Sequence, residues 1–162
     1  SKKLESKKII RIMPNLMAKY SLSQTMIYSR NKKILNGNFY KIIKCFGTII
    51  NSKNEDEINL ATAIYGSGPA FIAYIINSFL LASQSISKKS KINDIDLINL
   101  FNSVLSLNKN SKDLQKFINS IAIKKGTTQA GIKFLKSQNL KKLIYMTLDR
   151  AYKRAKEIGI EK

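Results

Sequence analysis

Histidine is absent from this chain of 162 residues, tryptophan is absent as well, and cysteine occurs once. Without histidine there is no Ser/His/Asp triad, no His-paired cysteine nucleophile and no His-ligated zinc site such as HExxH. The single cysteine, Cys45, excludes a disulfide within the chain, which fits a reducing compartment. We therefore expect no metal site and a cytoplasmic location.

Acidic residues are also few, with ten Asp and Glu against 29 Lys and Arg. Several of the carboxylates, at 55–57, 94–96 and 113, stand where a helix is expected to begin, and the helix dipole accounts for acidic residues there. A hydrolase that works with a pair of carboxylates is therefore not favoured.

The formal net charge of +19 is the main argument for a nucleic-acid binder. The charge comes from 25 lysines and only four arginines, spread along the chain without grouped aromatic residues. Readers of DNA and RNA favour arginine for base contacts and aromatics for stacking. An excess of Lys, Ile and Asn is also what an AT-rich coding sequence would produce. Nucleic-acid binding stays an alternative and is not the expected function.

Long apolar runs are missing too. The longest, residues 69–82, is shorter than the roughly 20 residues that a membrane span needs, and Asn77 and Ser78 interrupt it. The basic start, SKKLESKK, is not followed by the apolar core of a signal peptide. We expect no membrane association. With 44% hydrophobic residues, the chain suffices for one ordinary domain or for parts of two.

The first fifty residues predict short strands around one helix. Strands are expected at 8–13, where Pro14 stops a β-branched run, at 24–29 and at 48–51. Apolar residues at helical spacing from Phe39 to Phe46 predict a short helix that ends at Gly47. This β-β-α-β series is too small for a complete sheet domain and indicates the tail of a larger one.

From residue 52 onward the pattern is helical. Ser52 or Asn54 is expected to cap a helix that runs to about residue 84. After a polar connection at 85–94, helices are expected from Asp94 to about 107, behind a cap at Ser111, at about 128–137 and at 140–156. The last helix is amphipathic and has a basic, solvated face.

The stretch 61–82, ATAIYGSGPAFIAYIINSFLLA, is expected to be a buried helical element with a break at 66–69. Gly and Pro inside a helix cost about 1 and 3 kcal/mol relative to Ala. Either small residues let another helix approach closely, or exposed amides at 66–68 face a ligand cavity, and both can hold. GSGPAF is not a dinucleotide fingerprint, because Phe71 replaces its third glycine and the stretch follows a helical pattern.

Two further segments are suited to ligands. In KKGTTQAG, 124–131, the amides of Gly126, Thr127 and Thr128 stand at the positive end of a helix dipole, as in a receptor for a carboxylate. Helix capping by Thr127 or Thr128 explains the same residues without a ligand. The loop MPN, 13–15, follows a strand, where open α/β sheets bind ligands, although a strand that ends in proline is common.

In this order and spacing, IIRIMPN, ATAIYGSGPAF, GTTQAGIKFL and the basic terminal helix resemble pyrroline-5-carboxylate reductase, the last enzyme of proline biosynthesis, from residue 9 to 156. The resemblance implies an oxidoreductase that uses NADPH or NADH to reduce 1-pyrroline-5-carboxylate to L-proline. It implies a mainly α fold, with 1–52 as the remnant of a dinucleotide-binding, Rossmann-type α/β domain. Residues 53–162 would form an all-helical dimerisation and substrate domain in a homodimer or an oligomer of dimers.

The resemblance also assigns residues. Met13, Pro14 and Asn15 match the segment on the nicotinamide side. Ser67 and Gly68 match the helix break beside the substrate cavity. Gly126, Thr127 and Thr128 match the loop that receives the substrate carboxylate and ring nitrogen, with Thr128 as the expected catalytic hydrogen bond to the imine.

The departures from the family pattern concern the nucleotide and the substrate loop. The dinucleotide fingerprint expected upstream of MPN is absent from the sequence. The family loop SPGGTT reads IKKGTT, so that Ile123, Lys124 and Lys125 replace serine, proline and glycine, and Asn77 stands at a common glutamate position. The chain is therefore expected to need a Rossmann domain, in cis or from a separate polypeptide. The alternative is a non-catalytic helical dimerisation module from a split or decaying gene.

Overall fold

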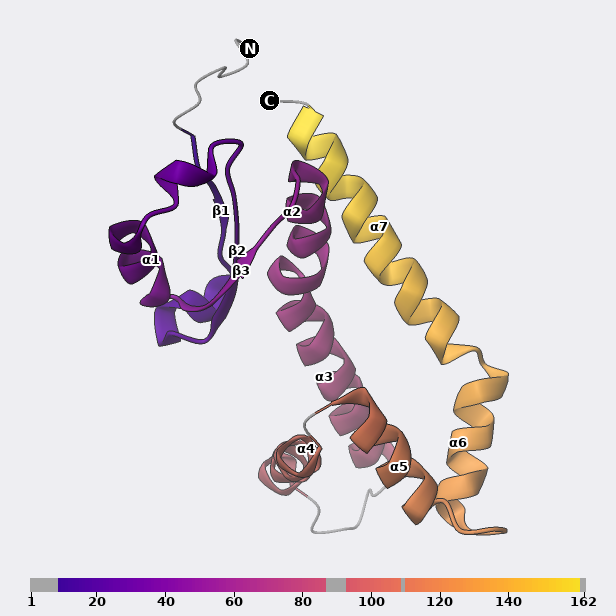
Figure 1. Cartoon of the computed structure of the whole chain (residues 1–162). Helices are drawn as coiled ribbons and strands as arrows, with labels where there is room; N and C mark the ends of the chain where they lie inside the picture. Colours follow the sequence, from indigo (N-terminus) through magenta and orange to yellow (C-terminus); the bar gives the residue numbers. More distant parts are fainter. Residues whose placement is uncertain (1–8, 87–92, 109, 161–162) are drawn as a thin grey trace. The chain divides into compact units, whose positions relative to one another are not determined.

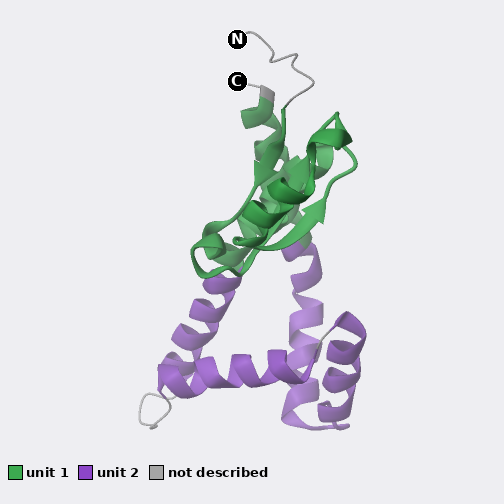
Figure 2. Ribbon diagram, turned by 60° about the vertical axis from the view of Figure 1, so that its left-hand side comes forward, with its two compact units in different colours: residues 1–71, 145–162 green, residues 72–144 purple. Residues whose placement is uncertain are grey.

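The structure is a computed structural model that describes residues 9–86, 93–108 and 110–160 (Figure 1). The chain divides into two compact units, and Figure 2 colours them separately. Residues 1–71 and 145–162 form the sheet unit, and residues 72–144 form the helical unit. The domain boundary predicted after residue 52 divides a nucleotide-binding remnant from a helical domain. The two compact units do not test this boundary, so it stays a prediction.

The sheet unit contains a three-stranded mixed sheet in the order β1-β2-β3. Strand β1 (Arg11–Met13) runs antiparallel to β2 (Ser23–Tyr28), and β2 runs parallel to β3 (Gly47–Asn51). Helix α1 (Gly37–Lys44) connects the parallel pair, and 3-10 turns η1 (Leu16–Tyr20) and η2 (Lys32–Ile34) lie in the connections. The β-β-α-β order predicted from the sequence is confirmed.

The start of β3 requires a glycine. Gly47 has a φ of 130°, and a Cβ built on it would stand 2.4 Å from the backbone oxygen of Ser23. The Ser23 amide donates to the Phe46 carbonyl at 2.9 Å, so the two strands approach each other closely at this point. The lack of a side chain at Gly47 therefore permits the parallel pairing of β2 and β3.

The core of the sheet unit lies where the sheet meets α1 and α2 (Glu55–Ala61). Its most deeply buried apolar members come from β2, α1, α2 and the turn after α2, and they are Ile27, Ile43, Ile58, Ala61 and Ala63, each at most 4% exposed. This small core holds together the sheet and the beginning of the long helical stretch, which is where two of the predicted site segments lie.

Asparagine starts most of the helices that the structure describes. Asn54 caps α2 through a 2.9 Å bond from the Glu57 amide, and the Glu57 carboxylate accepts in return from the Lys53 amide at 2.7 Å, as in a capping box. The same kind of side-chain cap is made by Asn15, Asn31, Asn36, Asn93 and Asn110. The predicted cap at Ser111 is wrong, because the preceding Asn110 accepts from the first-turn amides and Ser111 begins the helix.

Helix α2 continues into the π-helical turn η3 (Thr62–Gly66) and then into α3 (Gly68–Ile86). The remaining helices are α4 (Asp94–Leu107), α5 (Ser111–Ile121), α6 (Thr127–Ser137) and α7 (Leu140–Ile160). Their starts agree with the sequence to within a residue, whereas α7 extends beyond the predicted end at 156. The predicted connection at 85–94 lies mostly in 87–92, outside the described residues.

Helix α3 is exposed in the single chain, so the expectation of a buried element is wrong for the chain by itself. Ile72 is 59% exposed and Phe79 is 47% exposed. Within the helical unit, α3 and α4 line an apolar groove of about 440 Å³, and Phe79 packs edge-on against Phe101 at 5.3 Å between ring centroids. The helix is as apolar as a core helix, but the described residues of this chain do not cover it.

The stretch Glu55–Ile86 is 32 residues long, with a mean hydropathy of 1.4 in its most apolar window, enough by length and composition to cross a membrane. The apolar run 69–82, on which the sequence expectation rests, is by itself too short to span a membrane. The structure gives a longer helical stretch, because the π-helical turn joins α2 to α3. Length and composition are weak evidence of a span, because helices buried in protein cores meet the same criteria.

Within the sheet unit, α2 and the C-terminal half of α7 lie side by side (Figure 1). Tyr152 donates a hydrogen bond to the Asp56 carboxylate, and the Lys156 ammonium lies 3.0 Å from the same carboxylate. These two donors, Tyr152 first, lower the pKa of Asp56 below its ordinary value. The interaction of Lys156 with Tyr152, and after it that with Asp56, raises the pKa of Lys156. This cluster of polar and charged side chains connects the C-terminal half of α7 to the start of α2.

Candidate functional site

The MPN loop is held by a buried asparagine. Asn15 is 8% exposed, and its backbone amide donates to the Ser23 hydroxyl at 3.1 Å. Its side-chain oxygen accepts from Met17 at 3.0 Å, which caps η1, and its side-chain nitrogen donates to the Tyr65 carbonyl at 2.9 Å. Ser23 in turn accepts from the Thr25 hydroxyl at 3.0 Å, and both side chains are fully buried. A polar network inside the sheet therefore fixes the loop.

The predicted helix break is a π-helical turn rather than an open loop. The Ser67 amide donates to the Thr62 carbonyl at 3.0 Å, five residues back, and the Ser67 hydroxyl also points to that carbonyl at 3.4 Å. Gly68 is buried and begins α3, where the following Pro69 is tolerated in the first turn. The expectation of exposed amides at 66–68 is therefore wrong for Ser67, because the wider turn uses its N–H. Turns of this kind are frequent at functional sites.

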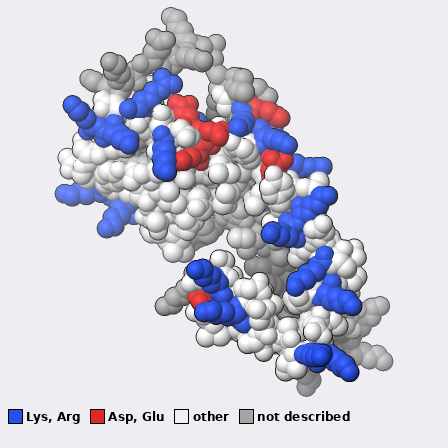
Figure 3. Space-filling model, turned by 45° about the vertical axis from the view of Figure 1, so that its right-hand side comes forward, with Lys and Arg blue, Asp and Glu red and all other residues white. Residues whose placement is uncertain are grey.

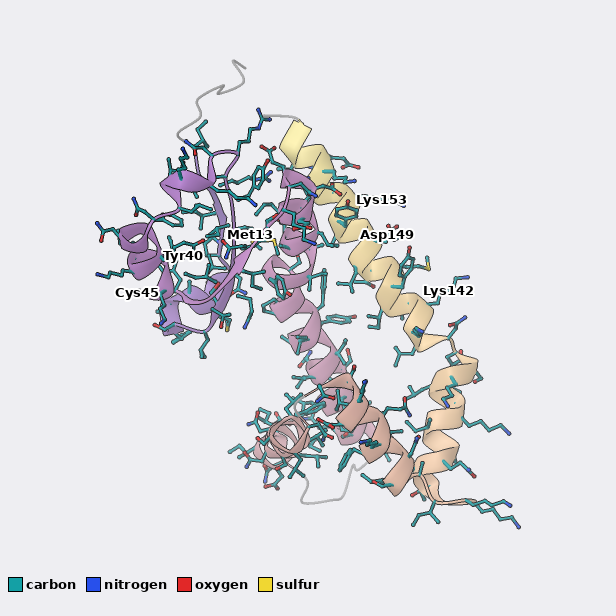
Figure 4. All side chains as sticks on the ribbon, in the orientation of Figure 1. Met13, Tyr40, Cys45, Lys142, Asp149 and Lys153 are labelled. Atoms are coloured by element: carbon teal, nitrogen blue, oxygen red, sulfur yellow. The ribbon has the colours of Figure 1, made fainter. Side chains whose placement is uncertain are left out.

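The structure brings the MPN loop and this turn together. Asn15 bonds to Tyr65, and a Cβ built on Gly66 would stand 3.7 Å from the sulfur of Met13. Figure 4 shows Met13 next to the helical turn. Pro14 is exposed on the same loop. The segment expected on the nicotinamide side and the segment expected beside the substrate are therefore neighbours in the sheet unit.

The GTT loop belongs to the helical unit. Gly126, with φ −85° and ψ 168°, is the N-cap of α6 and offers no side-chain acceptor. The expectation of a hydroxyl cap from Thr127 or Thr128 is therefore wrong, because both residues lie inside the helix. Within the described residues, the amides of Thr127, Thr128 and Gln129 donate to no acceptor. Thr127 is exposed and Thr128 is half-buried.

Two hydrogen bonds donated by backbone amides hold the loop before Gly126. The Gly126 amide donates to the Ile123 carbonyl at 2.9 Å, and the Lys125 amide donates to the Gln129 side chain at 2.9 Å. Lys125 has a φ of 64°, in the left-handed region that glycine adopts at least cost. The backbone therefore keeps a glycine-like conformation where the family pattern has glycine. Sequence reasoning missed Gln129, although a glutamine four residues after Lys125 could have pointed to such a bond.

A cavity of about 1010 Å³ lies in the helical unit between α5, α6 and the start of α7. Its lining includes Ile118, Gln129, Ile132 and Lys136, and it does not include Gly126, Thr127 or Thr128. The predicted substrate loop therefore lies outside this cavity. The loop belongs to the helical unit and the Ser67 turn belongs to the sheet unit.

Charge and metal ligation add little to either site. Figure 3 shows the lysine and arginine side chains dispersed over the visible face rather than gathered in a single patch. Among the residues that the structure describes, no group of three or more His, Cys, Asp or Glu side chains is placed to hold a metal ion. Cys45 is exposed, and its sulfur lies 3.7 Å from the Lys41 carbonyl.

Comparison with known proteins gives one consistent result. A family model described as pyrroline-5-carboxylate reductase dimerisation matches residues 55–158. Pyrroline-5-carboxylate reductases of Staphylococcus haemolyticus and Staphylococcus aureus are 26% and 29% identical to the chain over 93% of its length, and the chain spans 56% of theirs.

Solved structures agree on the fold. A pyrroline-5-carboxylate reductase from Coxiella burnetii has a TM-score of 0.71 at 25% identity, covering 91% of this chain and 56% of that one. The Plasmodium falciparum pyrroline carboxylate reductase with NADP bound has a TM-score of 0.75 at 21% identity, covering 93% and 62%. The likeness covers both the sheet and the helices of this chain.

Proposed function

This chain belongs to the pyrroline-5-carboxylate reductase dimerisation family, and on that premise we propose that it is the substrate-binding and dimerisation part of such a reductase. The reaction would be the reduction of 1-pyrroline-5-carboxylate to L-proline with NADPH or NADH. The chain spans about half the length of the curated relatives that it matches. The dinucleotide-binding domain would come from another part of the same polypeptide or from a second one.

The start of α6 supports this proposal most directly. Three consecutive amides at Thr127, Thr128 and Gln129 have no protein acceptor among the described residues, and the cap residue Gly126 supplies none. Unpaired amides and the positive end of the dipole favour a bound carboxylate. Lys124 and Lys125 are exposed immediately before this site and add positive charge. The substrate carboxylate would replace the missing cap.

The proposed reduction requires one more polar group at the substrate. Reduction of a C=N bond delivers a hydride to carbon and leaves nitrogen in need of a proton or a hydrogen bond. The Thr128 hydroxyl, half-buried in the first turn of α6, is the group that we assign to the ring nitrogen. Ser67 and Gly68, at the helix break where α3 begins in the sheet unit, stay separate candidates for contact with the substrate. A carboxylate and an imine nitrogen held at two fixed points would orient the ring for attack on one face.

The residues present fit only the reactive end of the nucleotide. Met13 and the exposed Pro14 offer an apolar surface to a flat ring. The sequence contains no G-x-G-x-x-G segment to hold a pyrophosphate. The nicotinamide cofactor, when bound, supplies the hydride. Met13 and Pro14 would border the nicotinamide ring.

Calorimetry with L-proline tests the carboxylate site. Replacing Thr128 with valine keeps the shape of the side chain and removes its hydroxyl. We expect Thr128→Val to weaken L-proline binding by about 1 to 3 kcal/mol, the usual effect of leaving a buried polar group unpaired. Thr48→Val, at an exposed position in β3, is the matched control and should leave the affinity unchanged. Equal affinities of wild type and Thr128→Val would remove Thr128 from the site.

Complementation separates the enzyme from a module that only dimerises. The chain is mixed with the separately produced dinucleotide-binding half of a relative, and oxidation of NADPH by 1-pyrroline-5-carboxylate is followed by absorbance. Turnover in the mixture but in neither half alone supports the proposal. A stable mixed complex without turnover would leave the chain as an assembly module.

A further inference from the structure

The carbonyl of Tyr65 has lost its partner within the helix. Four residues further on stands Pro69, which has no N–H to donate. The amide after it, Ala70, donates to Ser67 at 3.0 Å instead. Tyr65 is half-buried, and a backbone carbonyl withdrawn from water needs another donor. The GSGP sequence therefore creates an unmet acceptor on the side of the helix that faces the sheet.

Asn15 meets this acceptor from fifty residues away. Its side-chain nitrogen donates to the Tyr65 carbonyl at 2.9 Å. The other polar groups of Asn15 are also engaged: the amide with Ser23, the side-chain oxygen with Met17 and the carbonyl with Ala18. At 8% exposure, the side chain has little surface left for a cofactor.

We propose that Asn15 is a positioning residue that locks the MPN loop to the π-helical turn by supplying the hydrogen bond that Pro69 withholds. Its role therefore differs from the cofactor contact expected from the sequence, which falls to Met13 and Pro14. The bond fixes the distance between the nicotinamide-side loop and the turn that carries Ser67 and Gly68. The importance of this hydrogen bond for hydride transfer rests on the proposed function. The bond between Asn15 and Tyr65 is present in the structure whatever the function.

The first test compares two asparagine caps in the whole chain. Asn15→Ser keeps an oxygen that can cap η1, but its side chain is too short to reach Tyr65. Asn36→Ser is the matched control, because the Asn36 side chain caps α1 through the Phe39 amide at 3.0 Å and makes no other hydrogen bond to the described residues. By urea unfolding we expect Asn15→Ser to raise the unfolding equilibrium constant about tenfold, and Asn36→Ser less than about threefold. Equal effects of the two substitutions would overturn the proposal.

The second test adds the missing N–H. Pro69→Ala places an amide at the spacing from which Tyr65 can accept within the helix. In this background we expect the effect of Asn15→Ser on the unfolding constant to fall to less than about threefold, because the carbonyl then has its own donor. An undiminished effect would show that Asn15 does not substitute for the proline's missing group.

A local readout distinguishes positioning from general stabilisation. The methyl resonance of Met13 and the hydrogen exchange of the amides at 66–68 are measured in native conditions. Asn15→Ser should shift the resonance and accelerate the exchange, and Asn36→Ser should do neither. An unmoved Met13 resonance with unchanged exchange would overturn the proposal whatever the stability. None of these measurements needs NADPH or a substrate, so absence of turnover in the complementation assay counts against the proposed function alone.

Discussion

Replacing Gly47 with alanine should destabilise the sheet unit by an amount that the backbone geometry sets. The added Cβ would stand 2.4 Å and 2.7 Å from the oxygen and nitrogen of Ser23, and 2.9 Å from the oxygen of Ser21. All three neighbours are backbone atoms, so no flexible side chain can swing away. Ser23 is fully buried and paired with Gly47 in the parallel register. The sheet itself has to shift.

Two contributions, overpacking and backbone strain, add up to the expected loss in the free energy of unfolding. Forcing extra volume into a packed site costs about 1 to 3 kcal/mol. Holding a residue with a side chain at a φ of 130° adds a strain of about 1 to 3 kcal/mol. Partial relaxation of the strands lowers the sum, and we expect a loss of roughly 3 kcal/mol, which corresponds to a fall of about 6 to 12 °C in Tm for a chain of this length.

Urea unfolding followed by far-ultraviolet circular dichroism measures this loss at fixed protein concentration. Gly37→Ala is the matched control, because a Cβ on Gly37, the first residue of α1, meets no atom within 4 Å. The control should be neutral or more stable by up to about 1 kcal/mol. If Gly47→Ala unfolds within about 0.5 kcal/mol of the wild type, the close approach of β2 and β3 described above is refuted.

Two further predictions concern charge and assembly. Tyr152 and Lys156 hold the pKa of Asp56 below its ordinary value of 3.8 in the folded state. The unfolded state therefore binds the proton more readily, so the stability that this carboxylate contributes is fully present above the ordinary pKa and is lost as the pH falls through the lower folded pKa. The urea midpoint should therefore fall more steeply with acidification in the wild type than in Asp56→Asn, with Asp113→Asn as the control, and parallel profiles of wild type and Asp56→Asn would contradict the assignment. Ile75→Asp places a carboxylate in the apolar groove of α3 and α4, and we expect it to weaken self-association more than about 100-fold in sedimentation equilibrium. Asn77→Asp puts the same charge on α3 outside that groove and should leave association intact; if both variants associate like the wild type, the groove is not the interface.

Local signals predicted most of the elements of this fold. Pro14 ended a strand as expected, and Asp94 and Leu140 began their helices where predicted. The family resemblance, which rested on three motifs, is confirmed by the match over residues 55–158. Such features depend on neighbours within a few residues, and the sequence displays those directly.

The site depends on contacts that the local sequence does not display. The bond between Asn15 and Tyr65 joins residues fifty positions apart, and only the missing N–H of Pro69 indicated that an acceptor was left open. The predicted cap of α6 is wrong because Gly126 and Thr127 are both acceptable N-cap residues. Which of them caps the helix depends on the direction of the preceding loop, which Gln129 holds by accepting a hydrogen bond from the Lys125 amide. The roles of Gly126, Thr127, Thr128, Ser67 and Gly68 in binding substrate stay predictions.

The asparagine caps also determine how the chain tolerates chemical ageing. Slow hydrolysis turns an asparagine amide into a carboxylate, and Asp caps a helix as well as Asn does while it adds negative charge at the positive end of the dipole. Asn31, Asn36, Asn54 and Asn110 cap through oxygen alone, so this damage would leave those helices in place. At Asn15 the lost nitrogen is the one that holds Tyr65, and the same reaction would set a carboxylate against a carbonyl.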